Sequence, residues 1–447
     1  MTPNTPTARP SDRRAAEQRP TVLSRARIVD PARGLDAVGS VIVAEGRILA
    51  AGPEVLNQGN PEGWEVVDAE GMVIVPGLVD MRVFLGEPGH EHRETFASAS
   101  RAAAAGGVTT IVTMPDTDPV IDDPALVDFV LRRAREEADV RVHTMAALTK
   151  GQEGKETTEF GLLSAAGAVA FTDARKSVAS SLVMRRALTY ARDFGALIVH
   201  HVEDPSLAGA GVATEGEFAS RMGLPGIPRE AESIMLERDM RLVDLTRGRY
   251  HASQVSTAQS VEILRIAKAR GLDVTASVSI NHLSLNEMDI GTYRSFLKFS
   301  PPLRHEDDRQ AMIEAVADGV VDVIVSSHDP QDVEMKRHPF AEAADGAIGL
   351  ETLLSAGLRL VHDGRLSWSR FVEATSLRPA ERLGLSAGRL APGSPADLAV
   401  IDPGLPWLLD RQALASRSKN TPFEDARFIG RVVRTLVGGR TVHTLDA

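Results

Sequence analysis

Histidines and acidic residues stand near the ends of several apolar runs in this sequence. Asp173 closes the run GAVAFTD, and His201 lies in the stretch HHVEDPSL. Imidazole and carboxylate groups can hold a zinc ion, which lowers the pKa of a bound water and polarises a carbonyl group for hydrolysis. A catalytic zinc usually takes three ligands from the protein, so Asp173 and His201 alone predict at most one weakly held ion.

The other histidines are weaker candidates for metal ligands. His90 and His92 form an H-x-H pair, but the pair lies beyond the end of an apolar run, in a loop that leads to a helical stretch. His200, His282 and His328 are isolated histidines at the ends of such runs. A buried histidine of this kind is typically a hydrogen-bonded structural residue, and we predict that role for these three.

The elements that position these residues are organised around the stretch 72–89, MVIVPGLVDMRVFLGEPG. Its second apolar run, Leu78–Leu85, follows a Pro76-Gly77 turn and predicts a buried strand that ends at Phe84–Leu85. The further strand-like runs are Val108–Pro115, Val140–Leu148, Ala168–Asp173, Leu197–Val202, Tyr250–Val255, Val274–Ser279 and Val321–His328. The helical stretches between them include Ala97–Ala105, Pro124–Ala138, Ser180–Phe194, Ala258–Ala269 and Asp308–Ala317. This alternation is typical of an α/β protein and predicts a (β/α)8 TIM barrel, in which chemistry takes place at the C-terminal ends of the strands.

The two ends of the chain have a different pattern. Residues 21–71 and 388–447 alternate apolar and polar residues between turn signals, as short antiparallel strands do. We therefore predict a small β-sandwich formed by both ends, beside a barrel over residues 72–387. Residues 1–20 are polar and proline-rich without an apolar segment, which predicts a disordered tail and not a signal peptide.

The composition limits the classes of function. The 447 residues suffice for a barrel and a smaller second domain. A formal net charge of −11 argues against nucleic acid or an anionic membrane as the partner. The chain has no cysteine, which excludes disulfides and thiolate metal sites, and no apolar run reaches transmembrane length. We expect a soluble, cytoplasmic protein.

A series of stretches, in order, resembles the dihydroorotase family of the cyclic amidohydrolase superfamily. Besides residues 72–89, these are GHEHRETFASASRAAAAGGVTTIVTMPDTDPVID, GAVAFTD, HHVEDPSL, RYHASQVSTAQS, KFSPPLRHEDDR, DGVVDVIVSSHDP, KRHPFAEAADGAIGLET, SLRPAERLGL and GRLAPGSPADLAVID. The series covers nearly the whole chain after residue 20, which makes the resemblance specific. It implies the same barrel and sandwich, and a family activity that opens or closes a cyclic amide with one or two zinc ions.

The same resemblance implies that most of the family's metal ligands are replaced. The family has an H-x-H pair on the first strand, and an acid, two histidines and an aspartate on later strands. The replaced positions are now Arg82, Phe84, Gln254 and Ser327, and the retained ones are Asp173 and His201. A guanidinium and a phenyl ring have no lone pair to donate, and a serine in place of the aspartate is a poor general base at neutral pH. We therefore predict no catalytic zinc and no other cofactor.

The positions that bind substrate in the family have also changed. Gly86 stands in place of the arginine that holds the substrate carboxylate, and Asp116 replaces an asparagine. Ser300 replaces another asparagine, and Gln331 replaces the second histidine of the strand-eight motif. The loss of a bidentate arginine and the gain of a carboxylate both disfavour an anionic substrate such as dihydroorotate.

Two functions of different class follow from this pattern. The first is a dihydroorotase-like protein of pyrimidine biosynthesis that is non-catalytic and acts as a structural partner of aspartate carbamoyltransferase, as the resemblance implies. In this function the present chain is expected to be a homodimer. The second is an active, metal-poor cyclic-amide hydrolase, which would require zinc. A small-molecule sensor is a third possibility, with no direct support in the sequence. The number of replaced ligands favours the first.

Arg82 could take over part of the missing metal's charge. Without a cation, Asp173 would be a costly carboxylate in the barrel mouth. We predict an ion pair between Arg82 and Asp173 within about 4 Å. In the alternative, Arg82 points to solvent, and water or backbone amides satisfy Asp173.

Overall fold

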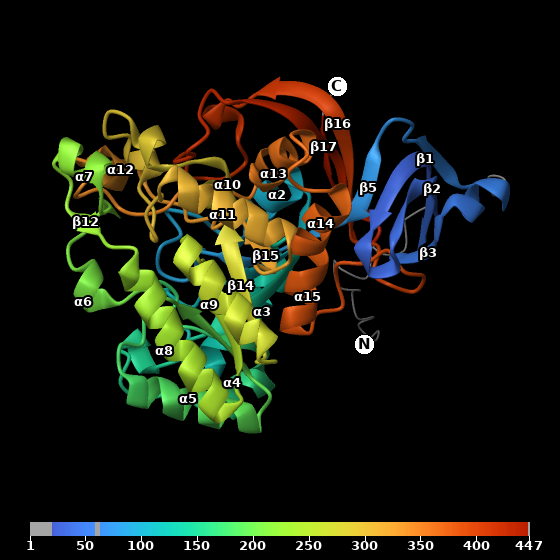
Figure 1. Cartoon of the computed structure of the whole chain (residues 1–447). Coiled ribbons are helices and arrows are strands. Elements are labelled where there is room, and N and C mark those ends of the chain that lie inside the picture. The colour runs from blue at the N-terminus through green and yellow to red at the C-terminus, as the bar shows by residue number, and fades with distance from the viewer. Residues whose placement is uncertain (1–19, 59–62, 446–447) are drawn as a thin grey trace, which may run out of the picture.

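The computed structural model describes residues 20–58 and 63–445, which form a barrel with a β-sandwich beside it (Figure 1). Except for Pro20, the tail predicted over residues 1–20 lies outside the described residues. Within the described ranges, no helix combines the length and the apolar character needed to cross a membrane.

Eight strands, each parallel to its neighbours, form the barrel in the order in which they occur in the chain. They are β6 (Leu78–Val83), β7 (Val108–Thr113), β8 (Arg141–Ala146), β9 (Ala168–Phe171), β10 (Leu197–His201), β13 (Arg249–Ser253), β14 (Val274–Ser279) and β15 (Val323–Val325). A bridge between Val83 and His328 joins the first strand to the segment after the last and closes the ring. All eight strands predicted from the sequence are therefore present. The eighth is shorter than predicted, because the chain leaves the sheet before Ser327, which has a positive φ of 53°.

Helices follow the strands and pack outside them, as the barrel pattern predicts. They are α2 (Phe96–Ala105), α3 (Pro124–Glu137), α4 (Phe160–Ala166), α5 (Ser181–Asp193), α8 (Glu230–Thr246), α9 (Ala258–Ala269), α11 (Glu306–Ala317), α13 (Leu353–His362), α14 (Trp368–Val372) and α15 (Arg378–Leu383). Shorter elements extend the loops at the strand ends: α6 (Pro205–Ala208), β11 (Ala213–Thr214), α7 (Glu217–Met222), β12 (Gly226–Ile227), α10 (Ile280–Ser284) and α12 (Val333–Arg337).

The barrel strands bury both of their faces. In β7, Ile111 belongs to the large apolar cluster shared with the helices, whereas its neighbour Val112 belongs to a second cluster with Met81, Met145 and Val325. Successive side chains of a strand point to opposite faces, so the second cluster fills the barrel interior. This burial on both sides explains why the barrel strands read as continuous apolar runs in the sequence.

The two ends of the chain share one sheet, as predicted. Its strands are β1 (Thr21–Asp30), β2 (Leu35–Ala44), β3 (Arg47–Gly52), β4 (Glu65–Asp68), β5 (Val73–Pro76), β16 (Leu398–Leu408), β17 (Arg427–Val437) and β18 (Arg440–Thr444). Figure 1 shows the blue N-terminal strands beside the red C-terminal ones. Side chains from both ends, among them Leu23, Ile28, Leu398 and Val400, form one apolar cluster.

The connection between the two ends is made by β5, which pairs with β1 on one side and with β16 on the other. This strand falls within residues 72–387, the range that the sequence assigned to the barrel. The sandwich sheet therefore extends to Pro76, and the barrel begins after the turn at Gly77. Both runs of the stretch 72–89 are apolar, which is why the sequence alone did not divide them between two sheets.

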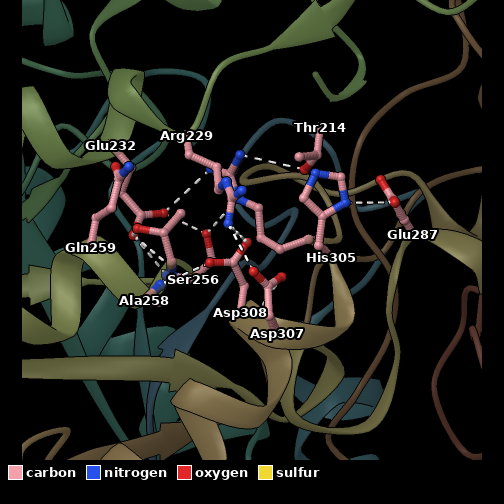
Figure 2. Close-up of polar contacts among 12 residues, drawn as sticks. Thr214, Arg229, Glu232, Ser256, Ala258, Gln259, Glu287, His305, Asp307 and Asp308 are labelled. Atoms are coloured by element: carbon pink, nitrogen blue, oxygen red, sulfur yellow. Dashed lines mark hydrogen bonds and ion pairs between the residues drawn. The ribbon is translucent and has the colours of Figure 1, made fainter. Parts of the chain in front are cut away.

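A buried carboxylate connects the start of α8 to the loop between β13 and α9. Glu232 is 1% exposed and accepts hydrogen bonds from the backbone amides of Ser256 (2.8 Å) and Thr257 (3.1 Å) and from the hydroxyl of Ser260 (2.6 Å). The guanidinium of Arg304, which is 3% exposed, lies 3.4 Å from the same carboxylate. Figure 2 shows Glu232 and Ser256 in this network. The contacts fix the long loops on this side of the barrel relative to the strands.

Candidate functional site

The positions that hold metal in the family lie at one end of the barrel. Arg82 is in β6 and Phe84 follows it, Asp173 follows β9, and His201 is the last residue of β10. The remaining two, Gln254 and Ser327, follow β13 and β15. Because the strands are parallel, these ends share the C-terminal mouth of the barrel, where the sequence placed them.

An aromatic ring and two guanidinium groups occupy the part of the mouth next to β6. The guanidinium of Arg175 lies 4.0 Å from the centroid of the Phe84 ring, and that of Arg82 lies 5.1 Å from it. Arg82 is 2% exposed, and its Nη1 donates to Ser253 Oγ at 3.3 Å. Burial, together with the nearby charge of Arg175, lowers the pKa of Arg82 to about 10. The ring thus provides a cation–π surface for both guanidinium groups at the end of β6.

Arg175 is also held by two carboxylates. Its guanidinium lies 3.3 Å from Asp116 and 2.8 Å from Asp329. Burial opposes the charge on Arg175, but Asp329 and Asp116 outweigh burial and raise its pKa. Burial raises the pKa of Asp116 to about 6, against the lowering effect of Arg175. The hollow that remains around these residues has a volume of about 80 Å³.

The predicted ion pair between Arg82 and Asp173 is wrong: within the described chain, no ion pair joins them. Asp173 instead accepts hydrogen bonds from the backbone amide and the hydroxyl of Thr149, at the end of the neighbouring strand β8. Burial raises the pKa of Asp173, and these hydrogen bonds oppose the rise. The carboxylate therefore has local donors, and it needs no cation from the other side of the mouth. The alternative was also wrong for Arg82, which is buried and not solvent-exposed.

His201 keeps a ring nitrogen available for a ligand. Its Nε2 lies 3.5 Å from Ser300 Oγ and 3.8 Å from a carboxylate oxygen of Glu203. Its Nδ1 is buried and has no hydrogen-bond partner among the described residues. Gln254, 2% exposed, also has an unpartnered side-chain nitrogen, Nε2. One imidazole and one carboxylate, beside an amide and a hydroxyl group, are fewer than the three protein ligands that a catalytic zinc usually takes.

The substrate positions of the family are remodelled by the backbone as well as by side chains. A Cβ atom on Gly86 would lie 2.0 Å from the carbonyl oxygen of His90, so the backbone found here has no room for an arginine at this position. Gln331 donates to Asp329 Oδ1 at 2.7 Å and so belongs to the cluster around Arg175. Gly86, Asp116 and Gln331, the positions that the resemblance compares with substrate-binding residues, therefore all make contacts within the chain.

The three isolated histidines are hydrogen-bonded, as predicted. His200 Nδ1 lies 2.7 Å from Asp239, and its Nε2 accepts from the amide of Val178 at 2.8 Å. His282 Nε2 lies 3.1 Å from the carbonyl oxygen of Pro301, and burial lowers the pKa of His282 to about 4. His328 Nδ1 accepts from the amide of Gly349 at 3.2 Å.

A zinc ion does not fit this set of side chains. Across residues 20–58 and 63–445, no three histidine, aspartate or glutamate side chains form a group that could hold a metal ion. The H-x-H pair, His90 and His92, belongs to no such group either. Three protein ligands are the usual minimum for catalytic zinc, and the mouth does not present them.

Sequence reasoning missed the residue at the centre of this arrangement. Arg175 matches no position of the family's motif that we considered, and Asp329 was not singled out. A signal was present, however. Asp116 adds a carboxylate to the mouth, and a partly buried carboxylate requires a cation. Arg175, two residues after Asp173 and close to the end of the fourth strand, was a basic residue that could supply it.

A family model and curated relatives point to one family. Residues 71–260 match the family model described as dihydro-orotase-like. The chain is 44% identical over 422 residues to the dihydroorotase of Anaeromyxobacter dehalogenans, covering 94% of this chain and 97% of that protein. It is 40% identical over 422 residues to the dihydroorotase of Geobacter metallireducens, covering 94% and 99%.

Solved structures of a hydantoinase and a dihydropyrimidinase share the fold of this chain. The L-hydantoinase of Arthrobacter aurescens superposes with a TM-score of 0.86 at 25% identity, over 95% of this chain and 96% of that one. The dihydropyrimidinase of Brevibacillus agri, at 21% identity and a TM-score of 0.82 over 95% of each chain, shares the fold. With relatives above 40% identity along almost its entire length, the chain belongs to the dihydroorotase family of the cyclic amidohydrolase superfamily.

Proposed function

We propose that this chain is a non-catalytic dihydroorotase homologue that works in the cytoplasm as a structural partner of aspartate carbamoyltransferase in pyrimidine biosynthesis. One observation carries the proposal. Arg175, stacked on Phe84 and ion-paired with Asp116 and Asp329, occupies the mouth where the family's metal chemistry takes place. A guanidinium cannot bind a metal, and it cannot activate a water as a general base.

The size of the mouth supports this proposal. Small-molecule sites usually measure roughly 300–1,000 Å³, whereas the hollow beside Phe84 and Arg175 measures about 80 Å³. The backbone at Gly86 excludes the arginine that would hold a substrate carboxylate. Asp116 places an acidic group where the family's substrate brings its own negative charge. Binding and chemistry are therefore both disfavoured at the same place.

We expect neither stoichiometric zinc nor dihydroorotase turnover from the purified chain. The protein would be produced with zinc in the medium, dialysed, analysed for metal by mass spectrometry and assayed for ring opening and ring closure. The Geobacter metallireducens dihydroorotase, treated in the same way, is the positive control. One retained zinc per chain together with turnover would refute the proposal.

The second candidate function is an active cyclic-amide hydrolase with an altered metal centre. The observation that favours it is that the relatives above 40% identity are named dihydroorotase. In this chain the unpartnered Nδ1 of His201 would be the ligand on which activity depends. If the purified protein turned over dihydroorotate and His201→Ala abolished the rate without lowering the melting temperature, this function would replace the first.

The partner is the carbamoyltransferase suggested by the family resemblance, with this chain as a homodimer. We expect the two proteins to elute together from a size-exclusion column after co-expression, at a mass above that of either alone. Deletion of the gene should impair carbamoyltransferase assembly or activity and leave ring closure, carried out by a separate dihydroorotase, unchanged. Independent elution combined with a normal carbamoyltransferase in the deletion strain would exclude this role.

A further inference from the structure

A second and larger hollow, of about 590 Å³, lies beside the barrel mouth. This hollow is lined by three segments that are distant in sequence: residues 294–296, residues 331–337, which include α12, and parts of residues 411–424. Its volume falls in the range of roughly 300–1,000 Å³ that is common for small-molecule sites. No residue lines both hollows, although Gln331, which lines this one, donates to Asp329 in the cluster around Arg175.

Positive charge is concentrated in this larger hollow, although the chain as a whole has a net charge of −11. Five lining residues are basic, and only two, Asp332 and Glu424, are acidic. The basic residues are Arg294, Lys336, Arg337, Arg411 and Lys419. Charges of one sign that line a concave surface raise the local concentration of ions of the opposite sign.

The two lysines of the lining donate to carbonyl oxygens and not to carboxylates. Lys336 Nζ donates to the carbonyl oxygens of Ser295 at 3.0 Å and Ala344 at 2.7 Å, and Lys419 Nζ donates to that of Ser416 at 2.7 Å. Neither forms an ion pair with a carboxylate in the described part of the chain. Carbonyl oxygens orient an ammonium group but do not neutralise it. Burial lowers the pKa of Lys336 to about 8, and an anion bound nearby would oppose that shift.

The arginines and one aromatic ring complete the lining. Arg294 is exposed, and no carboxylate of the described residues lies within ion-pair distance of it. Arg411 is paired with Glu424 at 2.9 Å, and its guanidinium lies 5.7 Å from the centroid of the Phe296 ring. Phe296 and the exposed Val333 add apolar surface next to these cations. Such a combination suits a ligand that is anionic at one end and apolar at the other.

We propose that this hollow is a binding site for a small organic anion, in which a phosphate group or a pair of carboxylates is attached to an apolar ring. The anionic group contacts Arg294 and the two lysines, and the ring lies against Phe296. The site goes beyond the scaffold function proposed above and does not depend on it. Because the lining comes from three separate segments, a bound anion would link them and stabilise the folded chain.

Calorimetric titration of the full-length protein tests the site with three probes. Phenyl phosphate carries a phosphate dianion on a ring, phthalate carries two carboxylates on a ring, and benzyl alcohol carries the ring alone. We expect at least one of the two anions to bind and to raise the melting temperature, and benzyl alcohol to do neither. The anion that binds more tightly identifies the phosphate or the dicarboxylate class. Absence of binding by both anions at millimolar concentration would overturn the proposal.

Matched variants locate the binding. Replacing both Arg294 and Lys419 by glutamine should weaken binding of the anion at least about tenfold, because two of its charge-assisted contacts are lost. The control replaces Arg241 and Arg265, which are exposed on α8 and α9, and makes the same change in net charge. The control should bind as the wild type does. Equal affinity in both double variants would contradict the site. The proposal would also be wrong if the protein bound a polyglutamate peptide and neither of the two small anions.

Discussion

Glu232→Ala is expected to lower the free energy of unfolding by about 4 kcal/mol, the largest single-site effect that we expect in this chain. The substitution removes the acceptor for the amides of Ser256 and Thr257 and for the hydroxyl of Ser260. It also leaves the buried guanidinium of Arg304 without its carboxylate. When one partner of a buried charge pair is removed, the other charge stays buried without a partner. The free energy lost in this way is larger than the net stabilisation that the intact pair contributes.

Urea denaturation at pH 7, followed by circular dichroism, measures this loss. Glu230→Ala is the matched control, since Glu230 is exposed on the same helix and accepts one side-chain hydrogen bond, from Gln259 at 3.1 Å. The control should change stability by no more than about 0.5 kcal/mol, as is usual for surface substitutions. If Glu232→Ala were as mild as Glu230→Ala, the network would have no structural role. Glutamine has nearly the shape of glutamate but no charge. A loss of stability in Glu232→Gln between those of the two alanine variants would therefore show how much of the effect is due to the charge of the carboxylate.

The barrel could be predicted from the sequence because its signal is local. Val274–Ser279 has the length and composition of a buried strand, and Ala258–Ala269 has the length and period of an amphipathic helix. In these two cases the bounds in the structure are the same as the predicted ones. The signal fails at Val73–Pro76, because a strand of the sandwich and a strand of the barrel can be equally apolar. Which sheet a strand joins depends on pairing with β16, which is more than three hundred residues away.

The candidate site was predictable in position but not in its contacts. The ordered motifs placed Arg82, Phe84 and Asp173 at one mouth, and the structure agrees. The proposed partner of Asp173 was wrong, because the sequence does not show that Thr149 offers two donors one strand away. The constraint at Gly86 was equally invisible, since the approach of the His90 carbonyl is set by the fold of the loop. Such contacts depend on which residues of neighbouring strands and loops come close in space. The identity of the replaced residues does not give this information.

Arg175→Met should destabilise the chain by about 3 kcal/mol at pH 7, because Asp116 and Asp329 would lose their shared cation inside the mouth. Methionine keeps the apolar contact with the Phe84 ring, so the substitution mainly tests charge. Arg265→Met, at an exposed arginine of α9, is the control, and its stability should stay within about 0.5 kcal/mol of the wild type. A loss of similar size in the control would point to a general effect of net charge.

The dependence of this loss on pH tests the assignment of Arg175 as the cation of the mouth. Burial already raises the pKa of Asp116 to about 6 in the folded chain, so ionising this group between pH 4 and pH 6 favours the unfolded state. Without Arg175 the folded pKa of Asp116 rises further, and the unfavourable range extends toward neutral pH. At pH 4 the carboxyl of Asp116 is protonated in the folded protein. The loss in the free energy of unfolding caused by Arg175→Met should therefore be smaller by about 1–2 kcal/mol at pH 4 than at pH 7. A deficit that is the same at pH 4 and pH 7, measured by urea denaturation at both, would mean that Arg175 stabilises the mouth by packing on Phe84 and not by its charge.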